Sequence, residues 1–474
     1  MVKSSRKPNS PHKQAAKPLP QEPSTRILHI TPDTPYAECS ERLTAFGGLL
    51  ALVKFLDLVG FPARFAEHYT APKRETKLGH CGMVCGILML LFIGFQRLGH
   101  FTYLRHDAML CGILRVAVLP AVSTFWRYLR AMGIIQSQSL LRLGAALRAR
   151  VWELCAYAPS RVRVNIDTTV STVYGAIEGA RKGHNPKHRG KKGLRPVLCF
   201  VHETREYLCG TQRRGETMNN EEVAHQIRQF RRLLPACVQQ VTVCGDGEFI
   251  GGESVEACQD EGFTFIFGNK RCAPPFPKRG WYRHGGHDYN ECEYQPQGWA
   301  KPCRFVVMRI REEQRGERQL KLLESEEYVY RVFVTNAKGR PHRVIAAYDQ
   351  RAAVEPLIGE AQREGVLAIP SKQFAAHHAF FQIVMLAYNL WRWMKWLAGH
   401  AEAQARRGEP VEEQQWITMP NHTLRIARLK MLYVAAKIVV HSNRDEVRYS
   451  EHEQRAAGLI DFLKYLDRRR KAAA

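Results

Sequence analysis

The spacing of apolar residues changes near residue 161, and this change restricts the chain to a mixed architecture built from modules. From 41 to 157 the apolar residues recur at helical intervals, as in the segment 45–61. From 161 onward they form short β-type runs, beginning with RVRVNIDTTV. The chain has 474 residues, and a single domain usually has about 100–150. We therefore expect a helical module followed by a module that contains a sheet.

The segment from 161 to 270 predicts strands and helices in the order β-β-β-α-β-α-β. Strands are expected within 161–170, 195–203, 207–215, 239–249 and 263–270, and helices within 219–234 and 253–262. Asn219, followed three residues later by Glu222, gives the first of these helices a capping-box start. Strands flanked by helices in this order predict an α/β layer architecture.

Composition divides the rest of the chain into further regions. Residues 1–26 hold five prolines, six lysines or arginines and one acid, which predicts a disordered basic arm. We expect an α/β core with an inserted β-rich subdomain, an all-helical N-terminal module and a helical C-terminal region. The expected boundaries are 1–40 for the arm and linker, 41–157 for the helical module, 158–271 for the first part of the core, 272–342 for the insertion, 343–398 for the final core helices and 399–474 for the basic C-terminal region.

The positive charge of the chain indicates a polyanionic partner. The formal net charge is +25, and the segment 181–195 contains seven lysines or arginines and no acid. We interpret the helical module as binding DNA ends and this segment as following a DNA backbone. An ordinary helical bundle and a solvated loop are the alternatives. The candidate DNA-binding residues are Arg127, Arg130, Lys182, Lys187, Arg189, Lys191, Lys192 and Arg195.

Several functional classes are disfavoured. The 13 cysteines are scattered, and Cys81 and Cys85 have no second pair nearby, so we expect reduced core thiols in the cytosol rather than zinc ligands. The apolar run 81–95 is shorter than the roughly 20 residues that span a bilayer, and it predicts a buried helix instead of a membrane segment. No export signal and no GxxxxGK[ST] phosphate loop are found, so neither secretion nor a nucleotide cofactor is expected.

Two aspartates are candidates for metal chemistry. Asp167 lies within an apolar strand, where an ionised carboxylate is costly unless it is paired or metal-bound. Asp246 ends another apolar strand and is followed by Gly247, and ligands of α/β sheets bind at such strand ends. If the two strands are neighbours, the carboxylates converge as Mg²⁺ or Mn²⁺ requires. Taken singly, an aspartate at a strand end is more often a turn residue.

A third carboxylate comes from an expected helix near residue 350. Tyr348, Arg351 and Glu355 are spaced by three and four residues, so they share one helical face. That face could also be an ordinary surface ion pair. Combined with the two aspartates, however, Glu355 would complete a site for metal ions that activate a water or a 3′-hydroxyl against a phosphodiester.

These residues together resemble the DDE transposases of bacterial insertion sequences. The resemblance is carried by Asp167 in a first strand, Asp246 after a fourth strand, and the pattern Y-x2-R-x3-E at Tyr348, Arg351 and Glu355. It covers roughly 161–395. It implies an RNase-H-like catalytic core interrupted by a β-rich insertion, with the three acids as catalytic, metal-binding residues. The cofactor implied is Mg²⁺, for which Mn²⁺ could substitute.

The resemblance also implies an activity and partners. Enzymes of this kind bind terminal inverted repeats, cut DNA at the element ends, and join the 3′-hydroxyl ends to target DNA. They act as synaptic complexes, here expected to contain a homodimer, on bacterial DNA in the cytoplasm. Arg351 would bind a DNA phosphate, and Tyr348 would stack or hydrogen-bond nearby, with helix packing as the alternative for Tyr348.

Two positions depart from the family pattern. The lysine expected seven residues after Glu355 is Gln362, and Pro356 disfavours helical backbone at Glu355. Glu360 is therefore a substitute candidate for the third acid. The alternatives for function are a non-catalytic DNA-binding protein derived from a transposase and an RNase-H-like nuclease without strand transfer.

Overall fold

The structure, a computed structural model, describes residues 28–73, 75–183, 185, 188–216, 218–311, 328–405 and 419–473. The expected disordered arm at 1–26 and the candidate Lys187 lie outside these ranges. The chain forms two units, Met1–Glu41 and Arg42–Ala474. The described part of the first unit, 28–41, contains neither helix nor strand. All elements below belong to the second unit.

A nine-stranded sheet forms the framework of this unit. Its strand order is β10-β11-β12-β13-β9-β8-β2-β6-β7. β2 is parallel to β8 and β8 to β9, whereas all other neighbours are antiparallel. The strands are β2 (Arg161–Thr168), β6 (Val197–Val201), β7 (Tyr207–Thr211), β8 (Gln240–Gly245), β9 (Thr264–Gly268), β10 (Tyr282–His284), β11 (His287–Tyr294), β12 (Cys303–Arg311) and β13 (Tyr328–Thr335).

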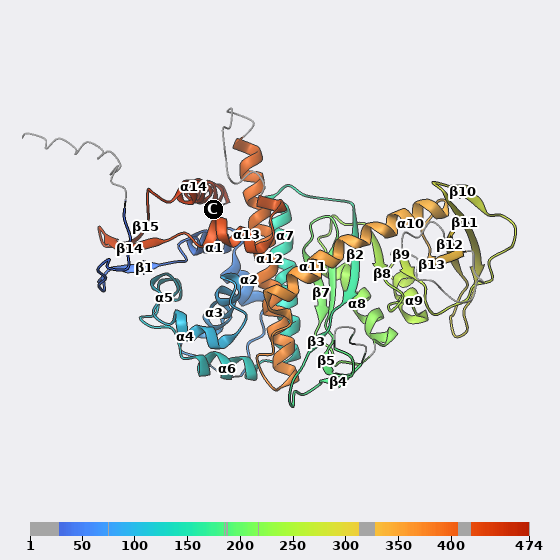
Figure 1. Cartoon of the computed structure of the whole chain (residues 1–474), viewed down its shortest axis with the longest axis horizontal. Helices are drawn as coiled ribbons and strands as arrows, with labels where there is room; N and C mark the ends of the chain where they lie inside the picture. Colours follow the sequence, from blue (N-terminus) through green and yellow to red (C-terminus); the bar gives the residue numbers. More distant parts are fainter. Residues whose placement is uncertain are drawn as a thin grey trace, which may run out of the picture. The chain divides into compact units, whose positions relative to one another are not determined.

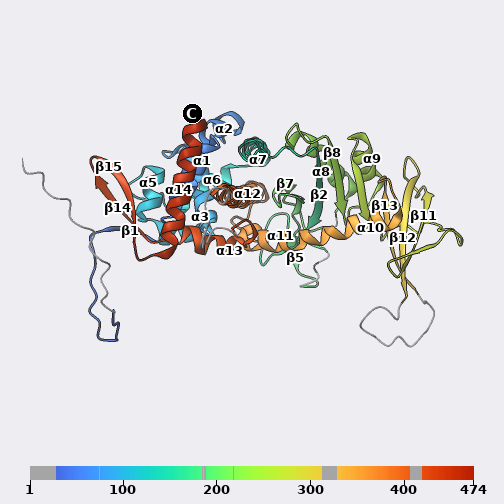
Figure 2. The ribbon, with the colours of Figure 1, turned by 90° about the horizontal axis from the view of Figure 1, so that it is seen from above.

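The alternating apolar residues of the central strands place helices on both faces of the sheet. On β9, Phe265 and Phe267 pack into one core with helices α8 (Asn220–Leu233) and α9 (Gly252–Asp260). Ile266 packs into another with α10 (Pro341–Asp349). Figure 2 shows α8 and α9 on one side of the strands and α10 on the other. The mixed α/β architecture expected from the sequence is therefore present.

The seven elements predicted between 161 and 270 are all present in the predicted order, but the prediction missed three short strands after the first one: β3 (Ser171–Thr172), β4 (Arg181–Lys182) and β5 (Lys192–Leu194). The five expected strands are β2, β6, β7, β8 and β9, and the two expected helices are α8 and α9. α8 has the predicted capping box, because the Asn219 side chain accepts from the Glu222 backbone amide while the Glu222 carboxylate accepts from the amide of Asn219. Patterns of this length and regularity were sufficient to predict the five strands from β9 to the edge strand β7.

The strands of the expected β-rich insertion extend the main sheet. β10 to β13 form an antiparallel succession, and β13 pairs with β9 through Phe333, Val334 and Thr335. The insertion and the central strands therefore share one hydrogen-bonded sheet. The chain then returns across the sheet through α10, the 3₁₀ segment η3 (Gln350–Ala353), α11 (Val354–Ala361) and the π-helical η4 (Gln362–Val366).

A helical region precedes the sheet, as expected. The apolar run 81–95 forms most of α3, whose residues 83 to 92 lie in the core apart from Cys85. No helix in the described ranges is long and apolar enough to span a bilayer. The helices of this N-terminal region are α1 (Leu49–Leu58), α2 (Phe61–His68), α3 (Gly79–Phe92), the short η1 (Leu98–His100), α4 (Phe101–Leu104), α5 (Ala108–Leu114), α6 (Val122–Ala131) and α7 (Ile134–Leu154).

The long helix α12 (Phe374–Ala405) joins the helical region to the sheet. It packs against α3, α6 and α7 on one side and against β7 on the other. Both views show α12 between the N-terminal helices and the strands (Figure 1). Its apolar residues therefore contribute to one continuous core that contains both helical and sheet residues.

The terminal regions, expected to be an all-helical N-terminal module and a helical C-terminal region, also contain strands. Besides η5 (Met419–Asn421), α13 (Leu424–Ala427), the π-helical η6 (Arg428–Leu432) and α14 (Gln454–Ala473), the C-terminal region contains strands β14 (Ala436–His441) and β15 (Arg444–Tyr449). They pair with β1 (Arg42–Thr44), from the start of the N-terminal module, in a three-stranded sheet. Ser442 and Asn443 both have positive φ, as a two-residue hairpin turn requires.

The buried carboxylate of Glu206, in the turn between β6 and β7, binds α7 and α12 to the sheet. It is 0% exposed and accepts hydrogen bonds from the indole nitrogens of Trp152 in α7 and Trp393 in α12. Its Oε2 also lies 3.1 Å from Nε of Arg148, which is 1% exposed. Because a buried charge is costly without such partners, Glu206 fixes how the helices meet the sheet edge.

We predict that Glu206→Gln strongly destabilises the fold. The change removes the counter-charge of buried Arg148, which should cost about 3–5 kcal/mol. The matched control is Glu153→Gln in α7, which changes an exposed glutamate paired with Arg150; the loss of this pair should cost less than about 1 kcal/mol. Urea unfolding followed by circular dichroism measures both. Equal midpoints for the two variants would contradict this role of Glu206.

Candidate active site

Asp167 and Asp246 lie side by side at the ends of two parallel strands. Asp167 is near the end of β2, and Asp246 directly follows β8. In the parallel ladder Ile166 is opposite Gly245, so the next residue of each strand is one of the two aspartates. The sequence predicted that these carboxylates would converge if their strands were neighbours, and the strands are neighbours.

Both carboxylates are held by local hydrogen bonds. Asp167 Oδ1 accepts from the Thr168 amide at 2.8 Å, and Oδ2 accepts from Nη2 of Arg351 at 2.8 Å. Asp246 Oδ1 accepts from the Glu248 amide at 2.9 Å. Asp167 therefore has the partner that its position in an apolar strand required, and this partner is an arginine.

The electrostatic environment of Asp167 favours its protonated form. Burial raises the pKa of Asp167 to about 6, the positive charge of Arg351 opposes this rise, and the negative charges of Asp246 and Glu248 add to it. Even with the Arg351 ion pair, the pKa of this carboxyl stays above that of an aspartate in water, because burial is the largest effect. A further cation near Asp167 would stabilise its ionised form.

Glu248 is a third acid at this site that the sequence prediction missed. Its Oε2 accepts from Arg195 Nη2 at 2.6 Å and from Thr168 Oγ1 at 3.3 Å. Its Oε1 is buried and has no hydrogen-bond partner among the described residues. The available signal was position alone, because Glu248 follows Asp246 by two residues, at the same strand end.

The segment α10-η3-α11 brings the tyrosine and arginine of the expected motif to the two aspartates. Arg351 binds Asp167, as described. The ring of Tyr348 packs on Phe333 of β13 with centroids 4.6 Å apart. Burial raises the pKa of the Tyr348 hydroxyl, Arg351 opposes the rise, and Asp246 adds to it. Tyr348 therefore packs on the sheet next to the acidic pair.

Glu355 is the exposed member of the expected triad. It lies in the first turn of α11, about one turn beyond Arg351. The segment changes from 3₁₀ to α-helix at Val354, so that Pro356 is the third residue of α11. A proline is tolerated in a first helical turn because its position needs no intrahelical N–H donor. The helix therefore does not end at Pro356. Instead, α11 begins two residues before it, at Val354.

Gln362, at the position where the family pattern has lysine, also faces the strand that carries Asp167. Its side-chain amide donates to Thr169 Oγ1 at 2.5 Å. The neutral amide therefore forms a hydrogen bond two residues from Asp167.

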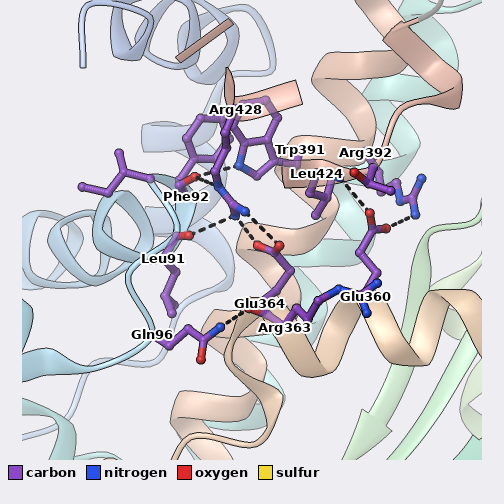
Figure 3. Close-up of polar contacts among 12 residues, drawn as sticks. Leu91, Phe92, Gln96, Glu360, Arg363, Glu364, Trp391, Arg392, Leu424 and Arg428 are labelled. Atoms are coloured by element: carbon purple, nitrogen blue, oxygen red, sulfur yellow. Dashed lines mark hydrogen bonds and ion pairs between the residues drawn. The ribbon is translucent and has the colours of Figure 1, made fainter. Parts of the chain in front are cut away.

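Glu360 does not belong to this site, which corrects its assignment as a substitute for the third acid. It is buried and accepts from the Arg392 guanidinium and from the Leu424 amide. One turn further, Glu364 pairs with Arg428, whose Nε also donates to the Phe92 carbonyl (Figure 3). Glu360 therefore holds this helical segment to α12 and α13, and Glu364 holds it to η6, whose Arg428 also contacts the end of α3.

The basic segment 181–195 forms a small sheet rather than a simple loop. Strands β3 (Ser171–Thr172), β5 (Lys192–Leu194) and β4 (Arg181–Lys182) pair in that order. Arg195 differs from its neighbours, because it is buried and paired with Glu248, and its charge is therefore not on the surface that the prediction assigned to DNA. The exposed candidates are Lys182, Arg189, Lys191 and Lys192, together with Arg127 and Arg130 of α6.

No three His, Cys, Asp or Glu side chains in the described ranges are grouped to hold a metal ion. The fit of a divalent cation must therefore be judged from donor chemistry. Asp167 and Asp246 supply the hard oxygen ligands that Mg²⁺ and Mn²⁺ take. The buried Oε1 of Glu248 has no hydrogen-bond partner among the described residues, and a bound cation would oppose the burial that raises the pKa of Asp167. The ligand atoms of these residues are therefore of the type that binds such a cation.

Comparison with known families gives the class of the protein. The family model for the transposase DDE domain, group 1, matches residues 39–471. This match spans most of the chain, and the chain belongs to the DDE transposase family. Family membership confirms the broad part of the resemblance seen in the sequence.

Comparisons with individual proteins are more distant. A solved chain of the piggyBac transposase synaptic complex with hairpin DNA is similar at 11% sequence identity and a TM-score of 0.40, covering 88% of this chain and 85% of that chain. No curated protein matches.

We predict that Asp167→Asn changes how stability depends on pH. An unfolded aspartate has a pKa of about 3.9, whereas that of Asp167 in the fold is raised to about 6. Its contribution to stability is therefore complete at low pH and is lost as pH rises through 6. The Tm of Asp167→Asn relative to wild type should be higher at about pH 7.5 than at about pH 5, where wild-type Asp167 becomes neutral. Calorimetry at both pH values measures this, and an equal Tm difference would contradict it.

Proposed function

We propose that this transposase binds the terminal inverted repeats of a bacterial insertion sequence, cuts the DNA at the element ends, and joins the 3′-hydroxyl ends to target DNA. Asp167, Asp246 and Glu355 are the proposed catalytic acids. The observation that carries the proposal is the register of β2 and β8, which aligns the two aspartates at neighbouring strand ends.

The topology supports an RNase-H-like core. In chain order, Asp167 lies on the first strand of the main sheet and Asp246 follows the fourth, as the sequence resemblance implies. The segment with Tyr348, Arg351 and Glu355 comes after the strands that extend this sheet. This order agrees with a catalytic core that is interrupted before its last acid.

Each residue of the site has a proposed task. Asp167 and Asp246 would hold Mg²⁺, with Mn²⁺ able to substitute, and Glu355, on α11, is the proposed third acid. Bound metal would activate a water or a 3′-hydroxyl and stabilise the leaving oxygen. Arg351, next to Asp167, donates to the phosphate under attack. Tyr348 keeps this arginine-bearing segment packed on the sheet.

The exposed basic residues of α6 and those of the small sheet β3-β5-β4 both lie next to the segment between η4 and α12. This arrangement supports a shared DNA surface. From α6, Trp126 donates to the Pro370 carbonyl and Arg130 to the Gln373 side chain. From the loop beside the small sheet, Glu178 donates its amide to the Lys372 carbonyl. Arg127 and Arg130 therefore lie next to the segment that also meets the region of Lys182, Lys191 and Lys192. We propose that one duplex contacts both surfaces.

The remaining parts of the proposal concern assembly and location. Two ends must be joined at once, so we propose a homodimer in a synaptic complex with the end DNA and the target DNA. The protein would act on bacterial DNA in the cytoplasm and would need no nucleotide cofactor.

We predict that Asp167→Asn, Asp246→Asn and Glu355→Gln each abolish cleavage without abolishing DNA binding. Rates should fall by about three orders of magnitude or more, because acids that act as one unit are not replaceable. The measurement is cleavage and strand transfer on labelled DNA carrying the inverted repeats that flank the coding sequence, with Mg²⁺, Mn²⁺ or chelator.

The control is Asp260→Asn, which changes an exposed aspartate of α9 and should cut normally. A wild-type protein that binds the ends but never cuts with either metal would instead be a non-catalytic DNA-binding protein. Cleavage by Glu355→Gln at the wild-type rate would remove Glu355 from the triad. Cutting without strand transfer or preference for the ends would indicate a nuclease.

We predict that Lys191→Gln with Lys192→Gln weakens DNA binding and lowers its salt dependence. Both lysines are exposed, and each phosphate contact contributes about 0.9 to the slope of log affinity against log salt. The slope should fall by about 2. Fluorescence anisotropy across a salt series measures it. The control pair Lys464→Gln with Lys471→Gln, on α14, should leave the slope unchanged; a drop shared by both pairs would mean that only net charge matters.

A further inference from the structure

Glu248 connects the strand ends that carry the two aspartates. Its backbone amide donates to Asp246, and its side chain accepts from the Thr168 hydroxyl. Thr168 in turn donates its own amide to Asp167. An unbroken set of hydrogen bonds therefore runs from Asp167 through Thr168 and Glu248 to Asp246.

The turn that carries Glu248 is itself held in place. Arg271, which follows β9, donates from Nη2 to the Glu248 carbonyl at 3.1 Å and from Nη1 to the Ile250 carbonyl at 3.2 Å. The Phe249 amide donates to the Asp246 carbonyl at 3.1 Å. Since the backbone is fixed on both sides, the position of the Glu248 carboxylate is set by the sheet and does not depend on a loose loop.

The burial of Glu248 exceeds what a surface ion pair needs. Its side chain is 16% exposed, and its partner Arg195 is 8% exposed. Only Oε2 makes hydrogen bonds, whereas buried Oε1 has none in the described part of the chain. An unpaired buried carboxylate oxygen costs free energy. Such a group calls for an explanation other than stability, and a role in function is one.

We infer that Glu248 is a positioning residue of the candidate active site: by joining the ends of β2 and β8, it sets how Asp167 and Asp246 face the same cation. The inference rests on the proposed metal-dependent function. It also explains why Arg195 is buried although it belongs to a basic segment, because its guanidinium holds Glu248 against Thr168.

The test is Mn²⁺ binding to the full chain, measured by titration calorimetry at a temperature where circular dichroism shows every variant folded. Glu248→Ala should weaken Mn²⁺ binding by about 10–100-fold, the range found for residues that orient metal ligands. Glu248→Gln keeps an acceptor for Arg195 and Thr168 and should recover most of that loss. The matched control Glu253→Ala, at an exposed position in α9, should bind as wild type does.

Thr168→Val provides a second variant if Glu248→Ala fails to fold. It removes only the hydroxyl that donates to Glu248 and leaves the pair with Arg195 intact. It should also weaken Mn²⁺ binding.

Two results would overturn the inference, and they differ from each other. Wild-type affinity in both Glu248→Ala and Thr168→Val, with weak binding by Asp167→Asn, would remove Glu248 from the site and leave the metal-dependent function standing. A wild-type chain that binds Mn²⁺ no better than Asp167→Asn would refute the metal-dependent function itself, and the role of Glu248 with it.

Discussion

The carboxylate of Glu206 is the contact on which the arrangement of helices and sheet depends. It is completely buried, and it joins α7 through Trp152 and Arg148 to α12 through Trp393. α12 in turn packs against the N-terminal helices. A charge in this place is stable only while all its partners are present, so the turn between β6 and β7 fixes the helices to the edge of the sheet, two strands from β2, which carries Asp167.

Regular patterns in the sequence predicted the centre of the fold and much of the candidate site. The apolar runs around Asp167 and Asp246 gave the strands, and the register of β2 and β8 then aligned the two aspartates. The spacing of Tyr348 and Arg351 predicted that both side chains lie on one helical face, and both lie near the aspartates. Local spacing was informative here because strand and helix periods are fixed by backbone geometry.

Most of the remaining features depend on long-range contacts that no local pattern contains. Arg195 looked like its exposed basic neighbours, and only the fold brings it to Glu248. Glu360 was a reasonable candidate ligand by its spacing, but its carboxylate pairs with Arg392, which lies 32 residues away in sequence. The hairpin of β14 and β15 is a local feature whose turn is Ser442 and Asn443, and the sequence analysis overlooked it; only its pairing with β1, almost four hundred residues earlier, is long-range.

The ion pair between Glu364 and Arg428 has a consequence for the order in which the protein becomes complete during synthesis. Arg428 also donates to the carbonyls of Leu91 and Phe92, so one side chain joins three segments far apart in the chain. The ribosome makes Arg428 after all three proposed catalytic acids. A growing chain that has not yet reached Arg428 therefore has the acids but lacks this contact, which helps to hold the segment that follows Glu355.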